Sequence, residues 1–164
     1  MTTRRAFLAA SLAAPALALS SYAVLAQPVA IGGIRVDTSR LVRDWGAHAA
    51  WVKVALERQL GAAFAPTLQP GAPLLYVTVR AISLSSYAAV GGGAGGGSAG
   101  NSDSLDCQTL LLGRGDRVLA TYPILTTLDA GDAGAWYLPD IDQRRLDRLV
   151  RATASWIKRY VVPG

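Results

Sequence analysis

The chain has 164 residues, 51% of them hydrophobic, and a formal net charge of +5 from sixteen Lys and Arg against eleven Asp and Glu. This apolar fraction excludes a disordered protein, and the length suits one domain with or without a processed segment. The single cysteine, Cys107, excludes an internal disulfide framework and a cysteine-rich zinc or iron–sulfur site.

Residues 1–26 have the organisation of a cleaved export signal. Arg4 and Arg5 precede an uncharged apolar run from Ala6 to Leu19, and small residues at Val24 and Ala26 occupy the −3 and −1 positions of a cleavage site. Cleavage after Ala26 leaves residues 27–164 and lowers the net charge from +5 to +3, since Arg4 and Arg5 are removed. Cleavage after Ala23 is an alternative.

The sequence Thr-Arg-Arg-Ala-Phe-Leu at residues 3–8 resembles the twin-arginine export signal, whose pattern is Ser/Thr-Arg-Arg-x-Phe-Leu, often followed by Lys. Ala9 stands at the position of that Lys. The resemblance implies transport of a folded protein across the inner membrane into the periplasm. The alternative is an uncleaved anchor, although Pro15 and the many alanines make a poor spanning helix. The residue directly after the cleavage site is Gln27 and not a cysteine, which disfavours a lipid-anchored protein.

The remaining chain is long enough for one stable core without disulfides, so we expect a single domain over residues 27–164. Cys107 lies in a strand-like run, and we expect a buried, unreactive thiol. The alternatives are an intermolecular disulfide or a reactive site.

Alternation and helical spacing of apolar residues predict the secondary structure. Strands are expected at 31–36, 74–82, 104–112 and 117–125, with a hairpin turn at 113–116 joining the last two. One helix is expected from Trp45 to Phe64, capped by Asp44, and a second from Asp140 to Val161, with Gln143 completing a capping-box-like pair. Residues 126–139 show no period and are expected to form a loop. The apolar stripe predicted on the first helix consists of Trp45, Ala49, Val52, Leu56, Leu60 and Ala63. The stripe predicted on the second helix consists of Leu146, Leu149, Val150, Thr153, Ile157, Tyr160 and Val161. Lys53 and Glu57 are predicted to form an ion pair on the polar side of the first helix.

This order predicts an α+β domain: a two-layer sandwich in which two amphipathic helices cover one face of a four-stranded, mostly antiparallel sheet (β-α-β-β-β-α). If the first two strands are neighbours, the helix between them makes a parallel crossover.

Catalytic and metal-binding patterns are weak. The glycine-rich run Gly91–Gly100 lacks the ending of a phosphate-binding loop and is interpreted as a hairpin linker. His48 is the only histidine and is expected at the helix surface, so a common zinc set is not available. Ser83, Ser85 and Ser86 lie at or after the end of a predicted strand, and no residue is identified that could act as a base for them.

A cluster of four aspartates offers oxygen ligands for Ca²⁺ but lacks EF-hand spacing: Asp129, Asp132, Asp140 and Asp142. We therefore expect no catalytic residue, no metal and no cofactor.

The polar side of the last helix carries more basic than acidic residues, and an aromatic pair precedes it. A solvated face is one interpretation, and attraction to an anionic lipid surface or an acidic envelope protein is the other. Nucleic acid is disfavoured by the expected export. The candidate binding residues are Trp136, Tyr137, Arg144, Arg145, Arg148 and Arg151, with Lys158 and Arg159 further along against Asp142 and Asp147. Trp136 and Tyr137 are expected either to make an exposed aromatic contact or to pack into the edge of the domain.

The element order behind an export signal resembles small periplasmic auxiliary domains of envelope assembly, such as lipopolysaccharide-assembly lipoproteins and auxiliary lipoproteins of envelope lipid transporters. The likeness covers residues 29–162 in topology and length. The leading hypothesis is a non-enzymatic periplasmic binding or adaptor protein of the cell envelope, monomeric or homodimeric. The alternatives are a small-ligand or lipid-binding domain and, third, a hydrolase whose Asp or Ser residues converge in a cleft.

Overall fold

A computed structural model of the chain describes residues 29–86 and 102–162. The expected export signal and the glycine-rich run Gly91–Gly100 lie outside these residues. The described elements are four strands and three helices: β1 (Gly33–Asp37), α1 (Val42–Trp45), α2 (Ala47–Phe64), β2 (Leu74–Ser83), β3 (Ser102–Leu112), β4 (Val118–Asp129) and α3 (Ile141–Val161). Short 3-10 turns stand at Ser39–Leu41, Ala65–Thr67, Arg114–Asp116 and Ala130–Ala133.

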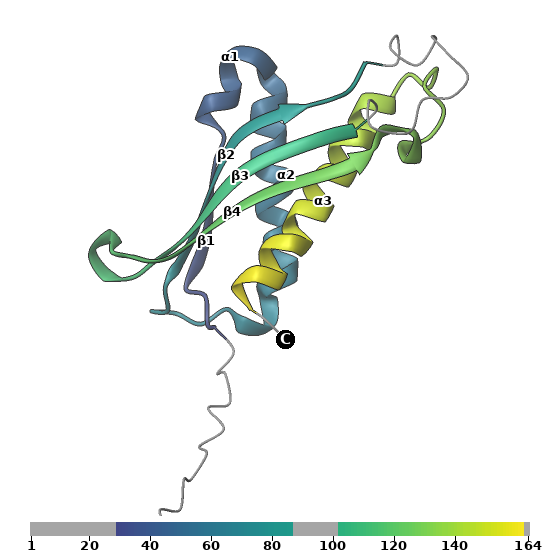
Figure 1. Ribbon diagram of the computed structural model, residues 1–164. Helices are drawn as coiled ribbons and strands as arrows, with labels where there is room; N and C mark the ends of the chain where they lie inside the picture. The colour runs from purple at the N-terminus through teal and green to yellow at the C-terminus, as the bar shows by residue number, and fades with distance from the viewer. Residues whose placement is uncertain (1–28, 87–101, 163–164) are drawn as a thin grey trace, which may run out of the picture.

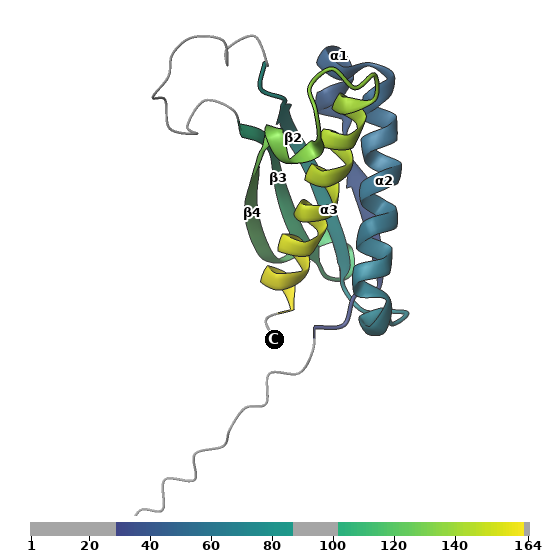
Figure 2. The ribbon, with the colours of Figure 1, turned by 90° about the vertical axis from the view of Figure 1, so that its right-hand side faces the viewer.

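The four strands form one sheet in the order β1-β2-β3-β4, with β1 parallel to β2 and the other pairs antiparallel. Helices α2 and α3 lie side by side on one face of this sheet, and the opposite face is uncovered in the described structure (Figures 1 and 2). The predicted two-layer α+β domain and the parallel crossover between the first two strands are therefore confirmed.

The core lies between the sheet and the helices. Its composition follows from the two-residue period of side chains in a strand and the 3.6-residue period in a helix. Alternate residues of β2 and β3 face the helices, and residues three or four apart on α2 and α3 face the sheet. The largest fully buried side chains are Phe64, Ile31, Leu56, Leu60, Leu75, Leu105, Leu146, Leu149, Ile157, Val36, Val52 and Val77. On α2 the buried stripe ends at Phe64, whereas the sequence pattern predicted Ala63.

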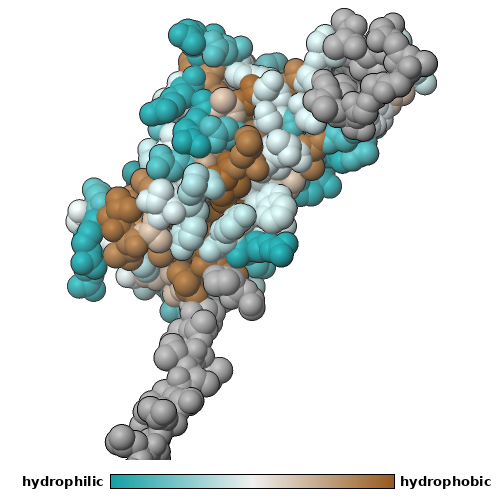
Figure 3. Space-filling model, viewed as in Figure 1, coloured by the Kyte–Doolittle hydropathy of each residue, from teal (hydrophilic) through white to brown (hydrophobic). Residues whose placement is uncertain are grey.

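The uncovered sheet face is mixed in polarity rather than uniformly apolar (Figure 3). Arg80 on β2 and Asp106 on β3 form an ion pair there, with Nη2 and Oδ1 2.5 Å apart. Apolar Leu125 on β4 lies beyond Asp106 in the same row of the sheet. A half-buried ion pair in the middle of the face keeps it from being one continuous apolar patch.

Four local predictions were wrong. Gly46, with φ of 48°, separates α1 from α2, so Asp44 lies inside α1 and does not cap the long helix. Asp140 precedes α3 without a capping hydrogen bond and pairs with Arg144 instead. Strand β4 continues to Asp129, because its backbone stays paired with β3 as far as Ser102. Thr126 in this extension is buried, and its hydroxyl is 2.9 Å from that of Thr153. The first half of the expected loop at 126–139 is therefore a strand and a 3-10 turn.

The two outer strands have features that discourage pairing with another chain. The Val36 N–H of β1 donates to Glu57 Oε1 of α2 at 3.2 Å, so the carboxylate that was expected to pair with Lys53 turns toward the strand. Pro123 stands in the middle of β4, and proline is accepted in an edge strand where its missing N–H faces outward.

Replacing Pro123 by threonine is expected to increase self-association, because it restores an outward N–H in the middle of edge strand β4. Size-exclusion chromatography with light scattering over a concentration series measures this. Thr121→Val is the matched control, since it alters strand propensity without adding a donor. A Pro123→Thr protein that stays as monodisperse as the control at every concentration contradicts the blocking role of the proline.

Candidate functional site

The candidate residues of α3 lie in different environments. The helix is strongly amphipathic, and one side packs against the sheet while the other faces solvent. Arg144, Arg148 and Arg151 lie outside the core, as the sequence predicted, with Arg148 half-buried and the other two exposed. Arg145 does not lie on this polar side.

Arg145 is only 3% exposed, which corrects the expectation of a surface binding residue. Its guanidinium pairs with Asp103 of β3, with Nε 2.8 Å from Oδ2 and a further contact from Nη2 to Oδ1. Nη2 also donates to the Ser85 carbonyl at 2.7 Å, and Nη1 donates to Asp142 at 3.1 Å. A buried charge must be paired and hydrogen-bonded, and this network satisfies that requirement.

The Arg145 network joins three parts of the chain. Ser85 follows β2, Asp103 lies near the start of β3, and Arg145 lies in the first turns of α3. The Ser85 N–H also donates to Asp103 Oδ1 at 3.0 Å. The two ends that flank residues 87–101 are thus fastened to each other and to the helix, so this cluster has a structural role.

Arg144 and Arg148 form exposed ion pairs with nearby aspartates. Arg144 Nε is 2.9 Å from Asp140 Oδ2, and this hydrogen bond holds the pKa of the Asp140 carboxyl below its ordinary value. Arg148 Nη2 is 3.0 Å from Asp132 Oδ2. Arg151 has no ion pair with any residue of 29–86 or 102–162. Its charge is therefore available at the surface.

Trp136 and Tyr137 are exposed, at 66% and 71%, in the connection that precedes α3. Their rings meet edge-to-face with centroids 5.8 Å apart. Of the two arrangements that the sequence left open for this pair, the structure therefore has the exposed one. The pair lies before the first turn of α3, whereas Arg148 and Arg151 lie near the middle of the helix.

A second aromatic pair, which the sequence interpretation missed, lies near the end of α3. Trp156 is 40% exposed and Tyr160 is 55% exposed. The prediction that Tyr160 belongs to the buried stripe of α3 is therefore wrong. Their ring centroids are 6.1 Å apart, and the Arg159 guanidinium lies 5.4 Å from the Trp156 centroid. The signal was present in the i, i+4 spacing of the two rings with an arginine between them.

Two shallow hollows lie between α3 and the edge strand β4. Figure 2 shows the backbones of these two elements. One hollow, of about 370 Å³, is lined by Leu128, Arg148, Arg151, Ala152 and Ser155. The other, of about 120 Å³, is lined by Pro123, Ile124, Leu125, Trp156 and Tyr160. We name the α3–β4 surface by its five exposed or half-buried members, which lie on α3 beside β4: Arg148, Arg151, Trp156, Arg159 and Tyr160.

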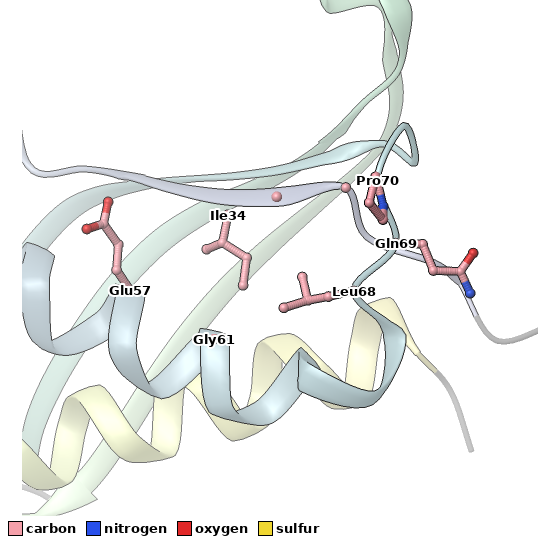
Figure 4. A pocket seen from close by; sticks show the side chains of 8 residues that line it. Ile34, Glu57, Gly61, Leu68, Gln69 and Pro70 are labelled. Atoms are coloured by element: carbon pink, nitrogen blue, oxygen red, sulfur yellow. The ribbon is translucent and has the colours of Figure 1, made fainter.

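A separate hollow of about 500 Å³ lies between β1 and α2. Figure 4 shows Ile34 of β1 and Glu57 of α2 bordering it, with Leu68, Gln69 and Pro70 at one end. Gly61 forms part of its wall on the helix, and a Cβ added there would meet nothing within 4 Å. Packing therefore does not require a glycine at this helical position, although glycine costs about 1 kcal/mol relative to alanine.

The described residues bring no metal set together: no group of three or more His, Cys, Asp or Glu side chains in 29–86 and 102–162 is arranged to hold an ion. Asp129 accepts from the Gly131 N–H, while Asp132, Asp140 and Asp142 each pair with an arginine. His48 is exposed, as expected.

Cys107 is buried and free, as the sequence predicted. Burial, followed by the charge of Asp106, raises the pKa of the thiol from 9.0 to about 12. The thiolate is the reactive form, so the native thiol is a poor nucleophile.

We expect Cys107 to stay unlabelled by a disulfide reagent such as DTNB at pH 8 in the native protein. With a pKa near 12, only about one thiol in ten thousand is ionised at that pH, and the reagent has no access to it. Absorbance measures the released thiolate, and one equivalent is expected after denaturation. Full labelling of the native protein within minutes contradicts this placement.

Comparisons with known proteins give no family. No protein-family model matches the chain, and no curated protein is similar to it in sequence. A solved structure titled "Crystal structure of uncharacterized protein" is similar at 16% sequence identity and a TM-score of 0.47, over 81% of this chain and 83% of that chain. In the described residues, no helix is long and apolar enough to span a membrane.

Proposed function

We propose that the chain is an exported, non-enzymatic binding or adaptor protein of the cell envelope that meets a partner through the α3–β4 surface. The observation that carries this proposal is the exposed group of Trp156, Tyr160 and Arg159 beside the edge of β4. Tryptophan, tyrosine and arginine are the residue types most enriched among the energetic centres of protein interfaces. The sequence of residues 1–26 supports export.

The geometry supports direct recognition by side chains. Pro123 interrupts the outer edge of β4, which disfavours addition of a continuous strand. The rings of Trp156 and Tyr160 instead border a hollow beside β4 that a partner side chain can enter. Arg159 lies over Trp156, and Arg151 lines the neighbouring hollow, so positive charge lies beside this apolar centre, as in an interface with a polar rim.

The proposal is tested by capture of the tagged, exported protein from a native envelope extract. We expect a specific partner to be captured by the wild type and lost in the Trp156→Ala/Tyr160→Ala variant. Trp136→Ala/Tyr137→Ala is the matched control, because it truncates the other exposed aromatic pair. Cell fractionation of the same strains tests export, and circular dichroism confirms that the variants fold.

Three results contradict the proposal. The first is retention of the full-length chain in the cytoplasm. The second is capture that is unchanged in Trp156→Ala/Tyr160→Ala, and the third is loss only in Trp136→Ala/Tyr137→Ala, which would move the site to the connection before α3.

The hollow between β1 and α2 favours a second candidate function, binding of a small ligand. Gly61 leaves this hollow open although its helical position has room for a side chain. Gly61→Leu is expected to abolish any ligand adduct seen by native mass spectrometry of the purified protein, while Gly61→Ala keeps it and retains the fold. Absence of an adduct in the wild type counts against this function.

A further inference from the structure

The positive charge of the domain is concentrated at one place. Residues 29–86 and 102–162 contain fourteen Lys and Arg and eleven Asp and Glu, a surplus of three. The part of α3 from Arg148 to Val161 has four cations and no carboxylate. One of these cations, Arg148, is paired with Asp132. The surplus of three therefore equals the charge of this half of α3 taken together with Asp132, and the rest of the described domain, with ten cations and ten carboxylates, is balanced.

The neighbouring strand does not neutralise this charge. Between Val118 and Leu128, β4 has no charged residue. Arg151 and Arg159 have no ion pair within the described residues, and Arg159 is held over the face of Trp156. The α3–β4 surface thus combines a fixed positive field with exposed rings, which complements a surface that is both acidic and apolar.

The shape of the surface distinguishes an acidic protein from an acidic bilayer. The hollow of about 120 Å³ lies between strand β4 and the rings of Trp156 and Tyr160. A recess receives a side chain that protrudes from a partner, as in the pockets filled at interface centres. Binding to a bilayer interface instead uses an apolar face that enters the lipid. The recess therefore favours a protein.

From this charge and shape we infer that the occupant of the α3–β4 surface is an acidic segment of a partner protein. This segment places an apolar side chain in the recess beside Trp156 and its carboxylates near Arg151 and Arg159. The inference rests on the proposed binding function and adds the chemistry of the partner. Charge attraction of this kind raises the association rate and weakens with salt.

The test uses the folded domain and synthetic peptides of one length. One peptide set combines aspartate and glutamate with a single leucine or phenylalanine, and the control set replaces the acids by lysine. Vesicles of phosphatidylethanolamine and phosphatidylglycerol, and vesicles of phosphatidylcholine alone, are the lipid probes. Peptide binding is measured by fluorescence anisotropy at two salt concentrations, and vesicle binding by co-sedimentation.

We expect the acidic peptides to bind and the basic ones not to bind. The Arg151→Gln/Arg159→Gln variant is expected to bind roughly tenfold more weakly, and Trp156→Ala about thirtyfold more weakly. Arg114→Gln/Arg117→Gln removes the same charge at the turn between β3 and β4 and is expected to bind like the wild type. Acidic peptides without an apolar residue are expected to bind more weakly than those with one.

Several results overturn the inference. Equal binding of acidic and basic peptides removes the charge complementarity. Equal loss in Arg114→Gln/Arg117→Gln shows attraction to net charge alone. Binding to phosphatidylglycerol vesicles without peptide binding makes a bilayer the occupant. If none of the probes binds while the envelope capture still depends on Trp156 and Tyr160, the partner chemistry is wrong and the proposed function stands.

Discussion

Replacing Arg145 by methionine is expected to lower the free energy of unfolding by about 3–5 kcal/mol, because it leaves Asp103 as a buried carboxylate without its cation. Asp103 is 2% exposed, so water cannot take the place of the guanidinium. The same substitution removes the hydrogen bond that Arg145 Nη2 donates to the Ser85 carbonyl at 2.7 Å. Asp103→Ala is expected to have a similar cost, since it removes the buried carboxylate that lies nearest the guanidinium of Arg145.

Urea unfolding followed by circular dichroism measures this effect. Arg144→Met is the matched control: it removes the neighbouring arginine, whose pair with Asp140 is exposed, and is expected to cost less than about 1 kcal/mol. The double variant Arg145→Met/Asp103→Leu removes both charges and is expected to recover much of the loss. A cost for Arg145→Met no larger than that for Arg144→Met contradicts the buried network.

Phe64→Ala is expected to lower the free energy of unfolding by about 3–5 kcal/mol. The ring is fully buried at the end of α2, within the hydrophobic core of the domain. Its removal loses transfer free energy and leaves a cavity that the rigid sheet cannot close. Val54→Ala on the same helix is the control, with an expected change within about 0.5 kcal/mol, since Val54 is largely exposed. Equal costs for the two variants contradict the core assignment.

The fold could be predicted because its periodic segments are long. The alternation of apolar and polar residues from Leu74 to Ile82 identifies the buried face of β2, and the apolar stripe identifies the buried face of α3. Two amphipathic helices and four strands can bury these faces in only a few layer arrangements. The end of β4 was missed because Thr126 is buried as a polar residue. Its partner Thr153 lies 27 residues away, so the alternation of apolar side chains is interrupted in the sequence.

The candidate site could be predicted only in part. Arg145 and Arg148 are indistinguishable in a sequence that has one basic stripe, and only the fold shows that Asp103 meets the first of them. Tyr160 fits the apolar period, yet the edge strand β4 ends the sheet before the ring is covered. Exposure at the edge of a sheet depends on strand order, which local pattern does not contain.

The central claim is that the protein meets its partner at the α3–β4 surface. Site-specific photo-crosslinking in living cells tests it most directly, with a photoreactive residue introduced at Ser155 or, as control, at Val42. Both side chains are exposed, but Ser155 lines the hollow beside Arg151, whereas Val42 lies on α1, away from this surface. We expect a discrete crosslinked protein from position 155 and none from position 42. No crosslink at 155, or the same products from both positions, contradicts the claim.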